Sequence, residues 1–261
     1  MVQRQFADKA AAYAASAVHA SGASLRKLSE LLQPQSSWRV LDVATGAGHT
    51  AHTVAPFVEQ VVATDLTQST LATARTLARE KSLDNVLTAA ADAAALPFFS
   101  GAFNLVTCRT AAHHFPDVDR FLSEAARVLA PAGLLAVVDN IAPGSKLRGR
   151  KGRVQREAGE YVNAFERLRD PSHVRSLSIY GWRDAFYAAG FAIQHEEVAT
   201  KEIDFSSWVM RGAVAPDDVT RLRAMLVQAP REALEFLTPL FRGDTIKFRL
   251  SEALLIGKKQ G

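Results

Sequence analysis

The 261-residue sequence contains one cysteine, Cys108, so neither an intramolecular disulfide framework nor a zinc site built from several cysteines is available. This cysteine usage fits a reducing compartment, and we expect a cytoplasmic protein. No apolar run approaches the roughly 18 residues that a membrane span requires, so no integral membrane segment is predicted. With 48% hydrophobic residues the chain can bury a substantial core unaided, and we predict no metal site.

The sequence also has no strong excess of charge of either sign, because 31 Lys and Arg residues are nearly balanced by 27 Asp and Glu residues. Much of the excess of +4 lies in one run: Lys146, Arg148, Arg150, Lys151, Arg153 and Arg156. The simpler interpretation is a solvated start of a helix. The alternative is a patch for an anionic substrate, a membrane surface or nucleic acid.

The N-terminal stretch from Ala10 to Ala20 follows two cations and superficially resembles a signal peptide, but it contains no Leu, Ile or Phe. Phe6, Ala10 and Tyr13 fall at helical spacing instead, so we predict an amphipathic helix within residues 1–30.

Strands and helices alternate between about residues 38 and 140. Short apolar runs predict strands at 38–43, 61–64, 86–90, 103–108 and 134–138. Such alternation predicts right-handed βαβ units and a parallel sheet with helices on both faces, that is, a doubly wound α/β fold.

The pattern changes after residue 140. A long charged helix is expected to end near Arg169, and a shorter helix at 182–189 is expected to end at Gly190. A strand at 191–199, a helical region at 204–240 and a last strand at 246–256 follow. We predict a single domain, 1–261, with 204–240 as a helical insertion before the last strand.

The segment between the first strand and its helix carries Gly46 and Gly48, which let a backbone approach a ligand closely at a helix N-terminus. Asp65 follows Gly46 by nineteen residues, at the end of the second strand. A carboxylate there can accept hydrogen bonds from both hydroxyls of a ribose. Together these features favour a nucleoside site over an ordinary strand-to-helix turn.

The same spacing nearly fits a dinucleotide fingerprint, with Ala51 in the third glycine position. Asp42, just before the loop, argues against a pyrophosphate and favours S-adenosylmethionine, whose amino group and sulfonium are cationic. Asp92, after the third strand, can accept from an adenine amino group.

The motifs VLDVATGAGHT, VVATDLT, AADAAALPF and RVLAPAGLLAVVD resemble class I S-adenosylmethionine-dependent methyltransferases, especially those of ubiquinone and menaquinone biosynthesis. The flanks are similar to a narrower bacterial branch of uncharacterised methyltransferases. The resemblance covers about residues 38–140, the cofactor-binding core. It implies a seven-stranded, mostly parallel sheet of order 3-2-1-4-5-7-6 with strand seven antiparallel, and an N-terminal helical lid over the cofactor. Asn104 and Ala132 depart from the family pattern, and we expect only local effects.

The expected cofactor-binding residues are Tyr13, Asp42, Ala44, Thr45, Gly46, Gly48, Asp65, Leu66, Asp92, Ala93 and Arg109.

At the end of the fourth strand, His113 and His114 are candidate catalytic residues, since a general base helps if the acceptor must lose a proton. The alternative is structural: one histidine packs beneath the cofactor and the other caps the following helix. Asn163, Arg169 and His173 are candidate acceptor-binding residues, although a helix end tied by local salt bridges explains them equally well.

We therefore expect methyl transfer from S-adenosylmethionine to a small organic acceptor, at carbon or oxygen. Nucleic acid is not expected, because no Asn/Asp-Pro-Pro-aromatic loop is present and Cys108 is not preceded by proline. The alternatives are a protein that binds S-adenosylmethionine without turnover and an NAD-dependent oxidoreductase. The oligomeric state does not follow from the sequence.

Overall fold

A computed structural model describes residues 23–261, which divide into two compact units. Unit 1 comprises residues 23–138, 185–196 and 254–261, and unit 2 comprises 139–184 and 197–253. Three long strands and one helix contribute residues to both units. The prediction of a single domain stays a prediction.

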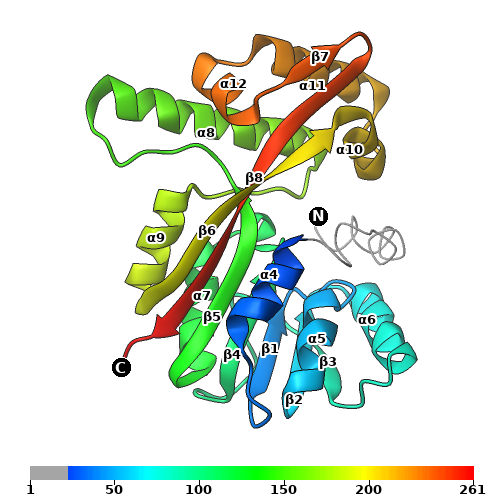
Figure 1. Cartoon of the computed structure of the whole chain (residues 1–261), viewed down its shortest axis with the longest axis vertical. Coiled ribbons are helices and arrows are strands. Elements are labelled where there is room, and N and C mark those ends of the chain that lie inside the picture. Colours follow the sequence, from blue (N-terminus) through cyan, green and yellow to red (C-terminus); the bar gives the residue numbers. More distant parts are fainter. Residues whose placement is uncertain (1–22) are drawn as a thin grey trace. The chain divides into compact units, whose positions relative to one another are not determined.

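One sheet of order β3-β2-β1-β4-β5-β8-β6 organises the chain, and the short β7 pairs with β8 (Figure 1). The strands are β1 (Arg39–Val43), β2 (Gln60–Asp65), β3 (Val86–Ala90), β4 (Phe103–Arg109), β5 (Leu129–Ile141), β6 (Phe191–Asp204), β7 (Leu240–Arg242) and β8 (Thr245–Lys259). β3, β2, β1, β4 and β5 pair in parallel, whereas β8 runs in the opposite direction. The predicted strand order is confirmed, with β8 as the antiparallel strand and β7 as an addition.

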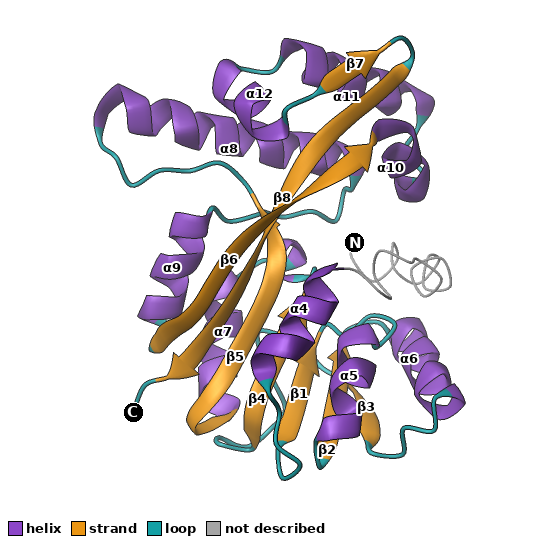
Figure 2. Ribbon diagram, in the orientation of Figure 1, coloured by secondary structure: helices purple, strands orange, loops and turns teal. Residues whose placement is uncertain are grey.

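The helices connect these strands as the periodicity predicts. In unit 1 they are α4 (Ala23–Leu32), α5 (His49–Val54), α6 (Gln68–Glu80) and α7 (Val118–Val128), with short 3-10 turns at Ala55–Phe57 and Ala112–His114. Figure 2 shows α4 and α5 on the near face of the sheet and α7 on the far face. The core on the α4 side joins Leu28 of α4 to Val40, Val61 and Leu105 of three neighbouring strands.

Unit 2 is mainly helical. Its helices are α8 (Gly149–Arg169), α10 (Phe205–Gly212), α11 (Pro216–Gln228) and α12 (Arg231–Leu237), while α9 (Ile179–Ala188) contributes residues to both units. The core of unit 2 packs Phe165 of α8 against Trp208 of α10 and Phe248 of β8, with ring centroids 5.0–5.6 Å apart. Gly190 follows α9 with φ 82°, the left-handed end that glycine favours.

β5 begins at Leu129, five residues earlier than predicted. The strand passes through Pro131 and Gly133, two residues that strands ordinarily disfavour. Ala132 adopts φ 58°, and the pairing of β4 with β5 shifts register between Phe103 and Leu105. A local irregularity therefore lets the strand include a proline that ordinary pairing would exclude.

Among residues 23–261, no helix is long and apolar enough to cross a membrane. The same part of the chain holds no group of His, Cys, Asp and Glu side chains arranged to bind a metal ion.

Candidate functional site

The loop from β1 to α5 has three left-handed residues at alternate positions: Ala44 at φ 53°, Gly46 at 56° and Gly48 at 86°. A Cβ at Gly46 would meet no atom within 4 Å, so this backbone faces open space. A Cβ at Gly48 would lie 2.6 Å from the ring of His52. The two glycines therefore serve different purposes: Gly46 leaves open space beside the loop, and Gly48 makes room for the His52 side chain of the following helix.

Asp65 lies beside this loop at the carboxyl end of β2. Its Oδ2 accepts a hydrogen bond from the Gly46 amide at 3.0 Å, and its Oδ1 accepts one from the Thr67 amide at 2.9 Å. Each carboxylate oxygen can accept a further bond, and the side chain is only half-buried. The neighbouring Leu66 presents an apolar side chain that is 46% exposed.

Asp42 is buried and accepts two short hydrogen bonds, from Thr107 Oγ1 at 2.6 Å and from Thr45 Oγ1 at 2.5 Å. Burial raises the pKa of this carboxyl, although both hydroxyls and the Arg109 charge act in the opposite direction. Through these contacts Asp42 links β1 to β4 and to the loop. This geometry does not favour the direct contact with a cationic ligand that the sequence suggested.

Arg109, at the end of β4, donates from Nε to Thr50 Oγ1 at 3.2 Å and so links β4 to α5. Thr107 was not anticipated from the sequence. Only the pairing of two distant strands reveals it, because Thr107 lies opposite Asp42 in the parallel register of β1 and β4.

Asp92 is exposed after β3, and its Oδ1 accepts from the Ala94 amide at 2.9 Å. This contact is typical of an aspartate in a local turn. The second carboxylate oxygen leaves an adenine contact open, so the roles of Asp92 and Ala93 stay predictions.

His113 and His114 form the short turn after β4, with ring centroids 4.1 Å apart and planes tilted by 44°. His113 is buried and His114 half-buried. Asp117 caps α7 itself, because its side chain accepts from the Arg120 amide at 2.8 Å. The interpretation of one histidine as the cap of this helix is therefore wrong.

Two of the candidate residues for binding the methyl acceptor, both in unit 2, form hydrogen bonds with nearby residues. Asn163 Oδ1 contacts His173 Nε2 at 2.8 Å and accepts from the Ser176 amide at 2.7 Å, while its Nδ2 donates to the carbonyls of Gly159 and Ser176. Asn163 and His173 are each 3% exposed. Their role in acceptor binding stays a prediction that this geometry does not favour. Tyr13 and most of the predicted lid, residues 1–22, lie outside the described residues.

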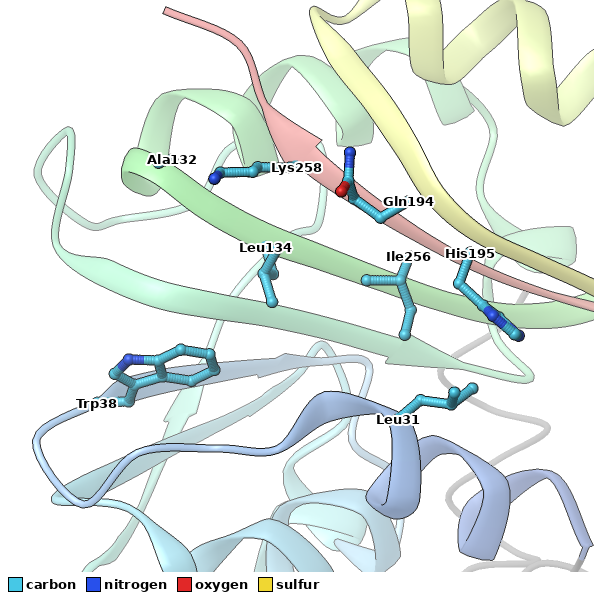
Figure 3. Close-up of a pocket in the computed structure, with 8 residues that line it drawn as sticks. All are labelled: Leu31, Trp38, Ala132, Leu134, Gln194, His195, Ile256 and Lys258. Carbon is cyan, nitrogen blue, oxygen red and sulfur yellow. The ribbon is translucent and has the colours of Figure 1, made fainter.

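A separate hollow of about 520 Å³ lies in unit 1 (Figure 3). It is lined by Leu31, Trp38, Ala132, Leu134, Gln194, His195, Ile256 and Lys258. Trp38 precedes β1 and Ala132 lies early in β5, so the hollow is at the amino ends of these parallel strands. The glycine loop and Asp65 follow carboxyl ends, which separates the hollow from the candidate cofactor site.

A parallel sheet of this order, with a glycine loop after β1 and a carboxylate at the end of β2, is typical of class I methyltransferases. Comparison with known proteins agrees: residues 41–137 match the model of the methyltransferase domain family. The uncharacterized methyltransferase YcgJ of Bacillus subtilis is 34% identical over 98% of both chains. The crystal structure of YcgJ matches with a TM-score of 0.84, covering 91% of this chain and 98% of that one. The chain therefore belongs to the family of S-adenosylmethionine-dependent methyltransferases.

The resemblance to quinone-biosynthesis enzymes is confirmed over part of the chain. Demethylmenaquinone methyltransferase of Thermus thermophilus is 40% identical over 117 residues, 44% of this chain and 52% of that protein.

Proposed function

We propose that this methyltransferase transfers the methyl group of S-adenosylmethionine to a small organic acceptor, at a carbon or an oxygen atom. The observation that carries the proposal is the pairing of Asp65 with Gly46: a carboxylate held at 3.0 Å from a loop amide, beside backbone that leaves open space. Nucleotide-binding sites of doubly wound folds combine a carboxylate acceptor for the ribose hydroxyls with room for the sugar.

In this proposal S-adenosylmethionine supplies a methyl group already activated by its sulfonium. Asp65 accepts hydrogen bonds from the ribose hydroxyls, and the backbone from Ala44 to Gly48 lies along the nucleoside. Leu66 offers its exposed side chain to the adenine ring, and Asp92 accepts from the adenine amino group. Asp42 does not touch the cofactor but holds Thr45 in place.

On the acceptor side, alignment of the acceptor atom with the methyl group is the main contribution of the protein, and such alignment supplies up to roughly 7–11 kcal/mol in well-oriented reactions. A general base is needed only where the acceptor loses a proton. His114 suits that role better than His113, because it is less buried. Cys108 is buried within β4 and has no role as a nucleophile in the proposal.

A screen of small metabolites with tritium-labelled cofactor tests this function directly. We expect label in at least one acceptor with the wild-type protein and much less with Asp65→Ala at the same limiting cofactor concentration. Cofactor binding without transfer to any member of a broad library would favour the alternative of a binding protein without turnover.

A further inference from the structure

Arg169, the last residue of α8, has a guanidinium group with no hydrogen-bond acceptor in residues 23–261. Its Nε is buried without a partner, and its side chain as a whole is 14% exposed. The only acid of the described chain within ion-pair distance is Asp170, at 3.7 Å from Nη1, beyond hydrogen-bonding distance. Asp170 uses Oδ1 for the amide and the hydroxyl of Ser172.

The position of this guanidinium is fixed by apolar contacts. Its Cζ lies 5.3 Å from the centroid of the Trp208 ring, which is itself stacked on Phe165 at 5.0 Å. A Cβ on Gly212 would lie 3.0 Å from Arg169 Nε, so the end of α10 packs closely against that atom. The cation is therefore held in one orientation, and within residues 23–261 its only anionic neighbour is the distant Asp170 carboxylate.

Another arginine of the same chain shows what a satisfied guanidinium looks like. Arg127 is more exposed, at 35%, yet it donates to both carboxylate oxygens of Glu124 and to the carbonyls of Phe98 and Leu96. A largely buried charge without such partners is unfavourable, because burial removes water that nothing replaces. Within the described part of the chain, Arg169 Nε therefore has no acceptor, and a ligand could supply one.

We infer that Arg169 binds an oxyanion, a carboxylate or a phosphate group, of a small molecule. If the proposed function holds, that molecule is the methyl acceptor, which then carries an anionic group. Oxygen atoms of either group match the planar donors of arginine, and the exposed part of the side chain gives them access. Asn163 and His173, in the same segment, are bound to each other and are not part of this site.

Trp208 serves as a fluorescent reporter of this site, because the Arg169 guanidinium lies over its ring. Of the two other tryptophans in the chain, Trp182 is also buried. The half-buried Trp38 is replaced in a Trp38→Phe background, which removes the accessible fluorophore. Iodide, an anionic quencher, is then compared with neutral acrylamide, and acetate or inorganic phosphate is added at constant ionic strength. The test variant is Arg169→Gln. The matched control is Arg153→Gln on the same helix, because Arg153 is exposed and its Nε lies 3.5 Å from Glu157 Oε1. Arg169→Lys keeps the charge without the planar donors and serves where the glutamine variant does not fold.

We expect iodide to quench more than acrylamide, acetate or phosphate to reduce that excess, and Arg169→Gln but not Arg153→Gln to abolish it. Stronger protection by acetate identifies a carboxylate ligand, and stronger protection by phosphate identifies a phosphate ligand. Equal quenching in the Trp38→Phe protein and in its folded Arg169→Gln variant would overturn the inference. Where the glutamine variant does not fold, unchanged protection by acetate or phosphate in Arg169→Lys would overturn it.

Transfer assays separate this inference from the proposed function. For an anionic acceptor, Arg169→Gln should lower kcat/KM by about tenfold or more, with unchanged affinity for S-adenosylmethionine. Normal transfer to such acceptors in Arg169→Gln refutes the anion site alone. Anion binding without any methyl transfer in the wild type refutes the proposed function alone.

Discussion

Replacing Asp65 by alanine tests both the cofactor site and the structure of its loop. Two charge-assisted bonds to ribose hydroxyls are lost, and bonds of this kind contribute roughly 1.5–3 kcal/mol each. We expect affinity for S-adenosylmethionine to fall at least tenfold, the effect of losing one bond, and about 100-fold when both bonds are lost at the lower value, roughly 3 kcal/mol.

The structure adds a consequence for the free protein. Asp65 also accepts from the amides of Gly46 and Thr67, so alanine leaves two backbone donors without their acceptor. Because water reaches this half-buried region, we expect the free energy of unfolding to fall by only about 1–3 kcal/mol. Asp65→Asn keeps one acceptor oxygen and should be intermediate in both measurements.

Calorimetric titration measures the affinity, and thermal unfolding without ligand measures the loop contribution. Asp84→Ala is a suitable control, because Asp84 is an exposed acid before β3. Unchanged affinity in a folded Asp65→Ala protein would refute the ribose assignment. A large loss of apo stability with normal affinity at low temperature would show that Asp65 serves only the loop.

Three further predictions concern the surroundings of this site. Gly48→Ala should lower the free energy of unfolding by about 2–4 kcal/mol through φ strain and collision with His52, whereas Gly46→Ala should lower it by about 1 kcal/mol yet weaken cofactor binding; equal melting temperatures would contradict this. Burial, with a smaller effect of Lys81, lowers the pKa of His52 from its ordinary value of 6.5 to about 4. Between these two pH values the unfolded chain binds a proton that the folded protein does not, so the free energy of unfolding should fall by about 2 kcal/mol as the pH is lowered from 6.5 to 4. His52→Gln should flatten that part of the melting-temperature profile, and an unchanged slope would assign the effect elsewhere. Removal of residues 1–20 should abolish transfer and leave a folded protein; full activity after truncation would place the lid elsewhere.

Most of the cofactor-binding sheet could be predicted from the sequence, because its signals are local. Each strand from β1 to β4 is a short apolar run, and Asp65 is recognisable as the acid that ends β2. The order of the strands came from the resemblance to a family, since periodicity alone does not determine which strands pair. β7 has three residues, all exposed, and offers no pattern to detect.

The contacts that distinguish similar residues were not predictable, because they connect distant positions. Gly46 and Gly48 look equivalent in the sequence, yet only the second is restricted by a side chain. In the sequence Asp42 looks like a partner for a cationic ligand, whereas in the structure it accepts from the hydroxyls of Thr45 and Thr107. Arg169 and Asn163 belong to one polar segment of the sequence. In the structure Asn163 is hydrogen-bonded through both side-chain atoms, whereas Arg169 Nε has no acceptor among residues 23–261.

The match to known proteins is uneven along the chain, and this bears on where acceptor selectivity lies. The methyltransferase domain model spans residues 41–137, which fall entirely within unit 1. Demethylmenaquinone methyltransferase likewise matches less than half of the chain, whereas YcgJ matches nearly all of it. A cofactor common to many enzymes requires the same loop and carboxylate in each, while different acceptors require different contacts. We therefore expect substitutions in unit 2, such as Arg169→Gln, to change which acceptor is methylated, and substitutions at Asp65 to reduce methylation of every acceptor alike.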